Sequence, residues 1–243
     1  MNALILAGGQ GTRLRPHTEA VPKPLLPLGK YTILDRQIRT LERFGIERIT
    51  LVTGYFAEKI RAHVAAAFPG RAFSFVHNAE FERSRPAFAI IQALPGLLGG
   101  DCLYLNGDVL CHPEVLARVL AAPASATAVQ KTPWDEEQVN VIQEPGSGRI
   151  TRLSKEIAAE HSHGEFIGVT KLTQAFLQAL HAIARAEGAE TFRHAFAVDL
   201  LDRAINQRAQ ALHAIDVTDL PALEIDTPAD YERALQTYAS LEE

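Results

Sequence analysis

Glycines and basic residues near the N-terminus have the types and spacing of an anion-binding loop. The apolar run 3–7 breaks into Gly8-Gly9-Gln10-Gly11-Thr12-Arg13, and Lys23-Pro24-Leu25 follows shortly afterwards. Glycine lets the backbone approach an anion closely, and successive N–H groups of a turn form a concave anion site. The side chains of Arg13 and Lys23 add positive charge. The pattern therefore predicts a phosphate-binding loop after a buried strand.

The two commoner phosphate motifs do not fit this loop. A P-loop ends in Gly-Lys-Ser/Thr, and no such string occurs in the chain. A dinucleotide fingerprint needs a third glycine where this chain has Leu14, and an acidic residue at a strand end. The nearest acidic candidate, Asp35, falls inside a helical pattern. An ordinary strand-to-helix turn remains the alternative, but the Lys-Pro-Leu element and the later motifs favour phosphate binding.

Two aspartates follow predicted strands further along the chain. Asp108 ends Asn106-Gly107-Asp108, which comes directly after a buried strand, and Asp226 follows Leu223-Glu224-Ile225. Ligands of open α/β sheets bind at the carboxyl ends of strands, and hard divalent cations prefer oxygen ligands. A turn role for Asp108 and a helix cap role for Asp226 are the alternatives. We expect the two carboxylates to lie on neighbouring strand ends and to share one Mg²⁺.

Hydrophobic periodicity predicts alternating strands and helices in the first half of the chain, which is typical of parallel βαβ units. The second half is less regular, with a hairpin expected across Pro145-Gly146-Ser147-Gly148. Predicted strands are 3–6, 49–53, 73–76, 102–105, 127–131, 140–142, 150–153, 166–169, 212–215 and 223–225. Predicted helices are 34–44, 57–68, 88–94 (broken by Pro95-Gly96), 174–185, 198–207 and one starting at Pro228.

Composition limits the class of protein. The 243 residues are 47% hydrophobic, with a net charge of −5 and no Lys/Arg-rich run, so a nucleic-acid surface is not expected. Cys102 and Cys111 lack metal-ligand spacing and are expected to be reduced. The N-terminal apolar run lacks a basic flank, and no segment is long enough for a membrane helix. We expect a cytoplasmic single domain over 1–243, with a nucleotide-binding half (about 1–110) and an acceptor-binding half (about 111–243).

The ordered set of motifs resembles the nucleotidyltransferase superfamily, which joins an NTP to a phosphorylated small molecule and releases pyrophosphate. The motifs are the glycine loop, Lys-Pro-Leu, Asn-Gly-Asp, Ser154-Lys155, residues 164–169 and Glu224-Ile225-Asp226-Thr227. Within it, the chain is most similar to the phosphocholine cytidylyltransferase-like branch, which also acts on phosphonates. The resemblance implies an α/β fold with a Rossmann-like, mixed, mainly parallel sheet flanked by helices, and Mg²⁺ on Asp108 and Asp226. It also implies a CTP site at Leu6, Ala7, Gly8, Gly9, Gly11, Thr12, Arg13, Lys23, Asn78 and Asn106.

The implied reaction brings two polyanions together, so positive charge and alignment are what the protein must supply. The attacking oxygen is already anionic, and no general base is needed. Arg13 and Lys23 suit the triphosphate, and Lys155 suits the acceptor phosphate as the matching lysine does in the family; its alternative is a solvated surface lysine. Glu165 is expected to order a sugar hydroxyl or a neighbouring lysine.

The chain departs from the phosphocholine branch where the acceptor should be recognised. A quaternary ammonium is held by aromatic rings, yet Trp134 is the only tryptophan, and Ala197 stands where an aromatic is expected. Arg83 and Arg85 replace small polar residues and favour a carboxylate or second phosphate. Phosphocholine is therefore not the expected acceptor, although Trp134, Phe192 and Phe196 could form a partial cage. An ordinary exposed loop is the alternative for the two arginines.

Three functions remain open from the sequence. The main one is an Mg²⁺-dependent cytidylyltransferase acting on a small phosphorylated or phosphonate acceptor. A sugar-1-phosphate nucleotidyltransferase using UTP or another NTP is the second, although the chain lacks the Glu-Thr-Gly-Gly-type element that such enzymes often carry. A catalytically silent nucleotide-binding subunit is the third, and the retained charges of Arg13, Lys23, Asp108 and Asp226 disfavour it. A homodimer is compatible with the sequence.

Overall fold

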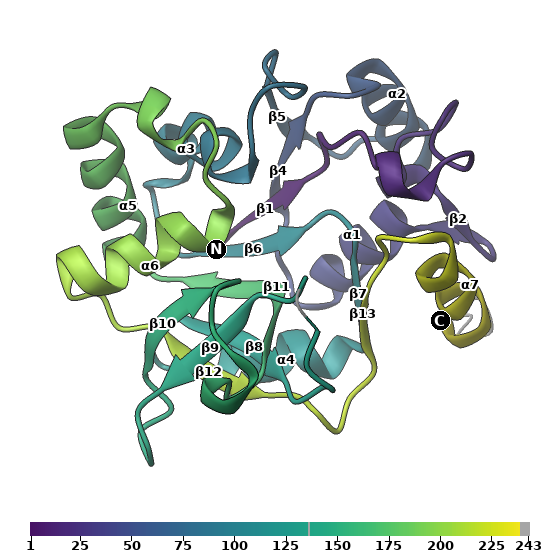
Figure 1. Cartoon of the computed structure of the whole chain (residues 1–243). Helices are drawn as coiled ribbons and strands as arrows, with labels where there is room; N and C mark the ends of the chain where they lie inside the picture. Colours follow the sequence, from purple (N-terminus) through teal and green to yellow (C-terminus); the bar gives the residue numbers. More distant parts are fainter. Residues whose placement is uncertain (136, 239–243) are drawn as a thin grey trace.

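Parallel strands from the first half of the chain form one side of the central sheet, in the order β6-β1-β4-β5 (Figure 1). The computed structural model describes residues 1–135 and 137–238. Parallel strands with both faces covered are largely apolar, as the central strands β1 and β6 are. Because they run in parallel, their carboxyl ends meet at one edge, where Leu6 lies beside Asn106 and Val52. The strands are β1 (Asn2–Leu6), β4 (Arg48–Thr53), β5 (Phe73–His77) and β6 (Cys102–Asn106).

The second half of the chain extends the same sheet with mostly antiparallel pairs. The long strand β11 (Glu165–Leu172) pairs antiparallel with β6, β8 and β9, and β12 pairs parallel with β8. The predicted hairpin is confirmed as β9 with β10. The predicted architecture, a mixed, mainly parallel sheet flanked by helices in one domain, is confirmed. The added strands are β8 (Ala126–Gln130), β9 (Asn140–Gln143), β10 (Ile150–Ser154) and β12 (His213–Asp216).

Helices cover both faces of the sheet (Figure 1). Each packs against it through an apolar stripe at helical spacing. One face carries α1, whose Leu34, Ile38 and Leu41 are fully buried, together with α2 and α4. The other face carries α3, α5 and α6, which pack on one another. The helices are α1 (Ile33–Arg43), α2 (Ala57–Ala67), α3 (Pro86–Leu97), α4 (Pro113–Ala121), α5 (Gln174–Glu187) and α6 (Ala197–Arg208).

Two helices differ from the sequence expectations. The predicted break at Pro95-Gly96 is wrong, because α3 continues through both residues to Leu97. Pro95 is exposed near the helix end, while Leu94 and Leu97 are buried at helical spacing, so packing outweighs one missing backbone bond. Helix α4 was not expected, although Pro113 at its first turn and buried Val115 and Val119 are its sequence signals.

A small separate sheet corrects the expected placement of the two aspartates. Strand β13 (Ala222–Glu224) pairs antiparallel with β7 (Val109–Cys111), not with the main sheet. Asp108 precedes β7 and Asp226 follows β13, so the expectation of neighbouring strand ends on one sheet edge is wrong. Antiparallel pairing nevertheless puts the start of one strand beside the end of the other. Helix α7 (Pro228–Tyr238) then packs over Leu14 and Leu26 through Tyr231.

Within residues 1–135 and 137–238, no helix is long and apolar enough to cross a membrane.

Candidate active site

A cleft of about 230 Å³ lies at the carboxyl edge of the parallel strands. It joins the glycine loop, the turn after β6 and the second residue after β13, three segments far apart in sequence. Both predicted metal ligands and most of the predicted nucleotide contacts line it. The lining residues are Leu6, Ala7, Gly9, Gly11, Thr12, Arg13, Lys23, Pro24, Gly107, Asp108 and Asp226.

Glycines make the floor of this cleft by allowing close backbone contacts. A side chain at Gly107 would overlap the carbonyl oxygen of Leu6, so the turn that carries Asp108 can lie directly against β1 only with glycine. Gly11 has a φ of +60°, in the left-handed region that favours glycine. Gly9, in contrast, has no atom within 4 Å of where its Cβ would stand. The loop therefore presents open backbone at Gly9.

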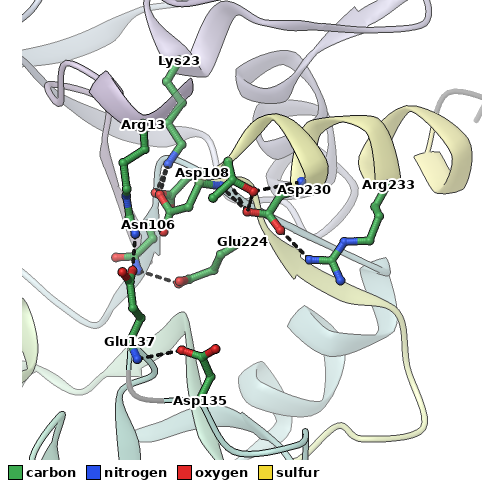
Figure 2. Close-up of polar contacts among 11 residues, drawn as sticks. Arg13, Lys23, Asn106, Asp108, Asp135, Glu137, Glu224, Asp230 and Arg233 are labelled. Atoms are coloured by element: carbon green, nitrogen blue, oxygen red, sulfur yellow. Dashed lines mark hydrogen bonds and ion pairs between the residues drawn. The ribbon is translucent and has the colours of Figure 1, made fainter. Parts of the chain in front are cut away.

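Lys23 links the two aspartates, and its contact with Asp108 is drawn in Figure 2. Its ammonium Nζ lies 2.6 Å from Asp108 Oδ2 and 2.6 Å from Asp226 Oδ1. Burial lowers the pKa of Lys23, but the negative charges of Asp108 and Asp226 outweigh burial, and the net pKa is raised. Lys23 is thus a fixed cation at the base of the cleft.

Arg13 stands at the mouth of the cleft, with more than half of its side chain exposed. One guanidinium nitrogen lies 2.9 Å from Asp226 Oδ2, and another pairs with Glu137. Burial opposes a raised pKa for Arg13, but the charges of Asp226 and Glu137 raise it. Sequence reasoning missed Glu137, because no motif marks a carboxylate on the loop between β8 and β9.

A partly buried polar network of Tyr104, Asn106 and Glu224 lies behind Asp108. The Tyr104 hydroxyl donates to Asn106 Oδ1, and Asn106 Nδ2 donates to Glu224 Oε1 at 3.1 Å (Figure 2). Burial, followed by the charge of Asp108, raises the pKa of Glu224 to about 8. Sequence reasoning gave Glu224 no role. Glu224 and Asp226 are two positions apart at the end of a strand, and this spacing indicates that their side chains point to the same face.

The chemistry of this donor set fits Mg²⁺. Asp108 Oδ1 is buried and has no hydrogen-bond partner among the described residues, so the carboxylate has an unused acceptor. Mg²⁺ is commonly bound by one or two carboxylates plus substrate phosphates and water. In the part of the chain that the structure describes, no cluster of three or more His, Cys, Asp or Glu side chains could hold a metal without such help. Asp108 and Asp226 remain the proposed ligands.

Three of the predicted nucleotide contacts do not line the cleft. Gly8 packs against the backbone of Thr53 and Gly54. Asn78 is buried, donates to Ser84 Oγ at 2.9 Å and accepts from the Glu80 N–H, which shapes the loop after β5. Asn106 belongs to the network described above. Gly8, Asn78 and Asn106 therefore contact other parts of the chain and do not line the cleft.

The predicted acceptor residues Arg85 and Lys155 meet at one aromatic ring. The Arg85 guanidinium lies 4.2 Å and the Lys155 ammonium 5.2 Å from the centre of Phe196, both within cation–π range. Arg83 is exposed on the same loop as Arg85. Glu165 has a different partner, because it accepts a hydrogen bond from Thr132 Oγ1 at 2.8 Å. Burial, partly opposed by that bond, raises the pKa of Glu165.

The suggested partial cage of three aromatics is wrong. Phe192 is fully buried, with Arg203 stacked on its ring, and cannot face a ligand. Trp134 is exposed. Phe196 already carries two cations, which repel a quaternary ammonium.

Curated relatives with similar sequences are nucleotide-transferring enzymes. The chain is 25% identical over 96% of its length to CMP-5′-(3-aminopropyl)phosphonate synthase of Streptomyces rubellomurinus, and spans 38% of that protein. It is 27% identical over 97% of its length to UTP–glucose-1-phosphate uridylyltransferase AglF of Haloferax volcanii, and spans 96% of that protein. The chain thus covers nearly the whole of one relative and a minor part of the other.

Solved structures share the fold. The inositol-1-phosphate CTP transferase from T. maritima matches with a TM-score of 0.81 at 20% identity, over 97% of this chain and 94% of that one. The CTP:phosphocholine cytidylyltransferase LicC from Streptococcus pneumoniae matches with a TM-score of 0.76 at 17% identity, over 97% of both chains.

A family model gives the assignment that these likenesses alone do not. The model of the MobA-like NTP transferase domain matches residues 3–200, from the first strand through the glycine loop and Asp108 to α6. Because this match covers most of the chain, the protein belongs to the family of the MobA-like NTP transferase domain and is a nucleotidyltransferase.

Proposed function

We propose that the protein is an Mg²⁺-dependent cytidylyltransferase, which transfers CMP from CTP to a phosphate or phosphonate oxygen of a small anionic acceptor. The observation that carries the proposal is the Lys23 ammonium, held 2.6 Å from both Asp108 and Asp226 inside the glycine-loop cleft. The cation and two carboxylates of the kind that bind a metal thus lie in the same cleft as the open backbone at Gly9.

The nucleotide would lie across Leu6 to Gly11, with its base toward the loop after β5. Gly9, Gly11 and Thr12 line the cleft and offer backbone N–H groups to the triphosphate. The nucleotide half (about 1–110) then supplies most of this site, whereas the acceptor half supplies Asp226 and Lys155.

The reaction needs alignment and charge from the protein rather than a base. An acceptor oxygen that is already ionised forms a bond to the α-phosphorus, while the bond from that phosphorus to the pyrophosphate oxygen breaks. Arg13 and Lys23 would stabilise the charge that gathers on the departing pyrophosphate. Bound Mg²⁺ would neutralise phosphate charge and align the reacting groups. When phosphates occupy the cleft, Lys23 and Arg13 gain new anionic partners in addition to the carboxylates.

The acceptor is proposed to bind at Phe196. Arg85 and Lys155 both lie against this ring, so an acceptor with a negative charge beyond its reacting phosphoryl group would find two cations in place. Arg83 is exposed on the same loop and could add a third. Charge-assisted bidentate contacts are the strong ones in such sites. The arrangement disfavours phosphocholine and favours a compact anionic or zwitterionic phosphonate.

The choice of CTP is supported by relatives named for CMP or CTP chemistry, one of which is a phosphonate synthase. A second candidate, a uridylyltransferase acting on a sugar 1-phosphate, is favoured by the Haloferax volcanii relative, which matches this chain over nearly the full length of both.

A pyrophosphate-release screen separates these candidates. CTP, UTP, ATP and GTP would each be tested with Mg²⁺ against 2-aminoethylphosphonate, phosphonoacetate, phosphocholine and glucose 1-phosphate, with Asp108→Asn as the inactive control. We expect the highest turnover with CTP and a phosphonate. Highest turnover with UTP and glucose 1-phosphate would support the second candidate. No release from any pair, together with tight nucleotide binding by calorimetry, would indicate a silent subunit.

A further inference from the structure

A second cavity, of about 790 Å³, lies beside α1 and the segment from β7 to the start of α4. Its lining shares no residue with the glycine-loop cleft. Ligand sites commonly have volumes of about 300–1,000 Å³. The cavity can therefore hold a molecule of nucleotide size or smaller without touching the candidate active site.

The cavity is strongly basic. Four cationic side chains line it, and three of them project from one face of α1, at positions 36, 39 and 43. Its one carboxylate, Glu42, pairs with Arg71, which is not a lining residue. Among the described residues, Lys30, Arg39 and Arg43 have no carboxylate partner. The charge of these three side chains is therefore available to an anionic ligand.

Aromatic stacking holds part of this charge in place. The Arg39 guanidinium lies 4.3 Å from the centre of the Tyr31 ring and 5.3 Å from that of Phe68, and Lys30 lies 5.4 Å from Tyr31. Stacking occupies the flat face of a guanidinium and leaves its N–H edge free to donate. Arg39 is therefore pre-oriented for an anion, at a lower entropic cost than a mobile surface arginine.

A buried amide oxygen at the same cavity lacks a partner. Gln37 is 6% exposed, and its Nε2 donates to the carbonyl oxygens of Asn106 at 2.8 Å and Val109 at 2.9 Å. These two bonds require the N–H₂ group, so they define which end of the amide is oxygen. Oε1 is buried and has no hydrogen-bond partner in the described chain. Because this oxygen has almost no accessible surface, Gln37 does not offer it to a ligand and instead ties the cavity wall to the turn that carries Asp108.

We propose that this cavity is a binding site for a phosphate ester. Lys30, Arg39 and Arg43 receive the phosphate. Because Gln37 lines the cavity and holds the carbonyls of Asn106 and Val109, the ligand sits one side chain away from the turn that carries Asp108. The site does not depend on the proposed choice of nucleotide or acceptor.

Titration calorimetry with ribose 5-phosphate tests this site without using turnover. We expect one saturable site per chain and no binding of ribose, which lacks the charge. Arg39→Gln should weaken ribose 5-phosphate binding by about tenfold or more, the loss typical of one charge-assisted hydrogen bond.

Arg61→Gln is the matched control. Arg61 also lies on a helix and stacks on an aromatic ring, 4.2 Å from the centre of Phe75, but does not line the cavity. This variant should bind ribose 5-phosphate as the wild type does, and so should Arg13→Gln in the glycine-loop cleft. The pyrophosphate release of Arg39→Gln should be unchanged in the absence of ribose 5-phosphate.

Absence of wild-type binding would overturn the proposal. So would binding that Arg13→Gln abolishes and Arg39→Gln does not, because the ligand would then occupy the glycine-loop cleft. Equal weakening by Arg39→Gln and Arg61→Gln would show a general charge effect and would also overturn it. The proposed cytidylyl transfer would be unaffected by any of these results.

Discussion

Lys23 and Asp108, 85 positions apart, form an ion pair of 2.6 Å at the base of the cleft, and the same ammonium reaches Asp226 at 2.6 Å. The lysine thus occupies the space between two carboxylates that the reaction would use for a metal. The Lys23 ammonium therefore holds together three segments of the chain, those that carry Lys23, Asp108 and Asp226.

Asp108→Asn is expected to lower turnover on the order of 10²-fold or more, because a neutral amide binds a divalent metal poorly. Pyrophosphate release should be measured at saturating CTP across a range of Mg²⁺ concentrations. Asp216→Asn is the control, since Asp216 pairs with Lys131 outside the cleft. Near-normal turnover of Asp108→Asn at high Mg²⁺ would rule out Asp108 as a metal ligand.

Lys23→Met is expected to destabilise the fold by about 3 kcal/mol, because it leaves two partly buried carboxylates without their shared cation. Mg²⁺ should recover part of this loss, and should raise the thermal midpoint of the variant more than that of the wild type. Thermal unfolding with and without Mg²⁺ measures both effects. A double variant, Lys23→Met with Asp108→Asn, should lose the Mg²⁺ response; if it keeps that response, the ion binds elsewhere.

Gly9→Ala is expected to weaken CTP binding by about tenfold at unchanged stability, since a methyl group on open backbone would keep phosphate away from its N–H groups. Gly99→Ala is its control, because Gly99 also has free space around its Cβ position but lies outside the cleft. Calorimetry and thermal unfolding would be run on both. Unchanged CTP affinity in Gly9→Ala would place the triphosphate away from this loop.

Gly107→Ala should behave in the opposite way. Its methyl group would overlap the Leu6 carbonyl oxygen, so the turn carrying Asp108 must shift or the strand must move. We expect a loss of about 1–3 kcal/mol in the free energy of unfolding, as for other overpacked sites, together with loss of activity. Chemical denaturation measures the first and pyrophosphate release the second. A stable, fully active Gly107→Ala would contradict the close approach.

Arg85→Ala is expected to raise the acceptor KM by about ten- to a hundredfold, with little effect on the KM for CTP. Arg83→Ala serves as the matched variant on the same loop, because Arg85, not Arg83, stacks on Phe196. The comparison should use a phosphonate and phosphocholine under identical conditions. If phosphocholine is the best acceptor and Arg85→Ala has no effect, Arg85 is a surface residue and the anionic acceptor is wrong.

The sequence by itself determined the strand–loop–helix order and the chemistry of the N-terminal loop. Short-range patterns carry this information: an apolar run before Gly8, a glycine where φ is positive at Gly11, and helical spacing at Leu34, Ile38 and Leu41. Such patterns report which side chains face a core and where the backbone must turn. They act over a few residues and can be read directly from the chain.

Only the tertiary structure decided which charges meet. The sequence singled out Asp108 and Asp226 as partners, but the wrong strand pairing was expected, because β-strand register depends on residues more than a hundred positions apart. Glu137 reached Arg13, and Phe192 was buried, through packing that no local pattern encodes. The continuation of α3 through Pro95 has the same cause, since burial of Leu94 and Leu97 outweighs local propensity.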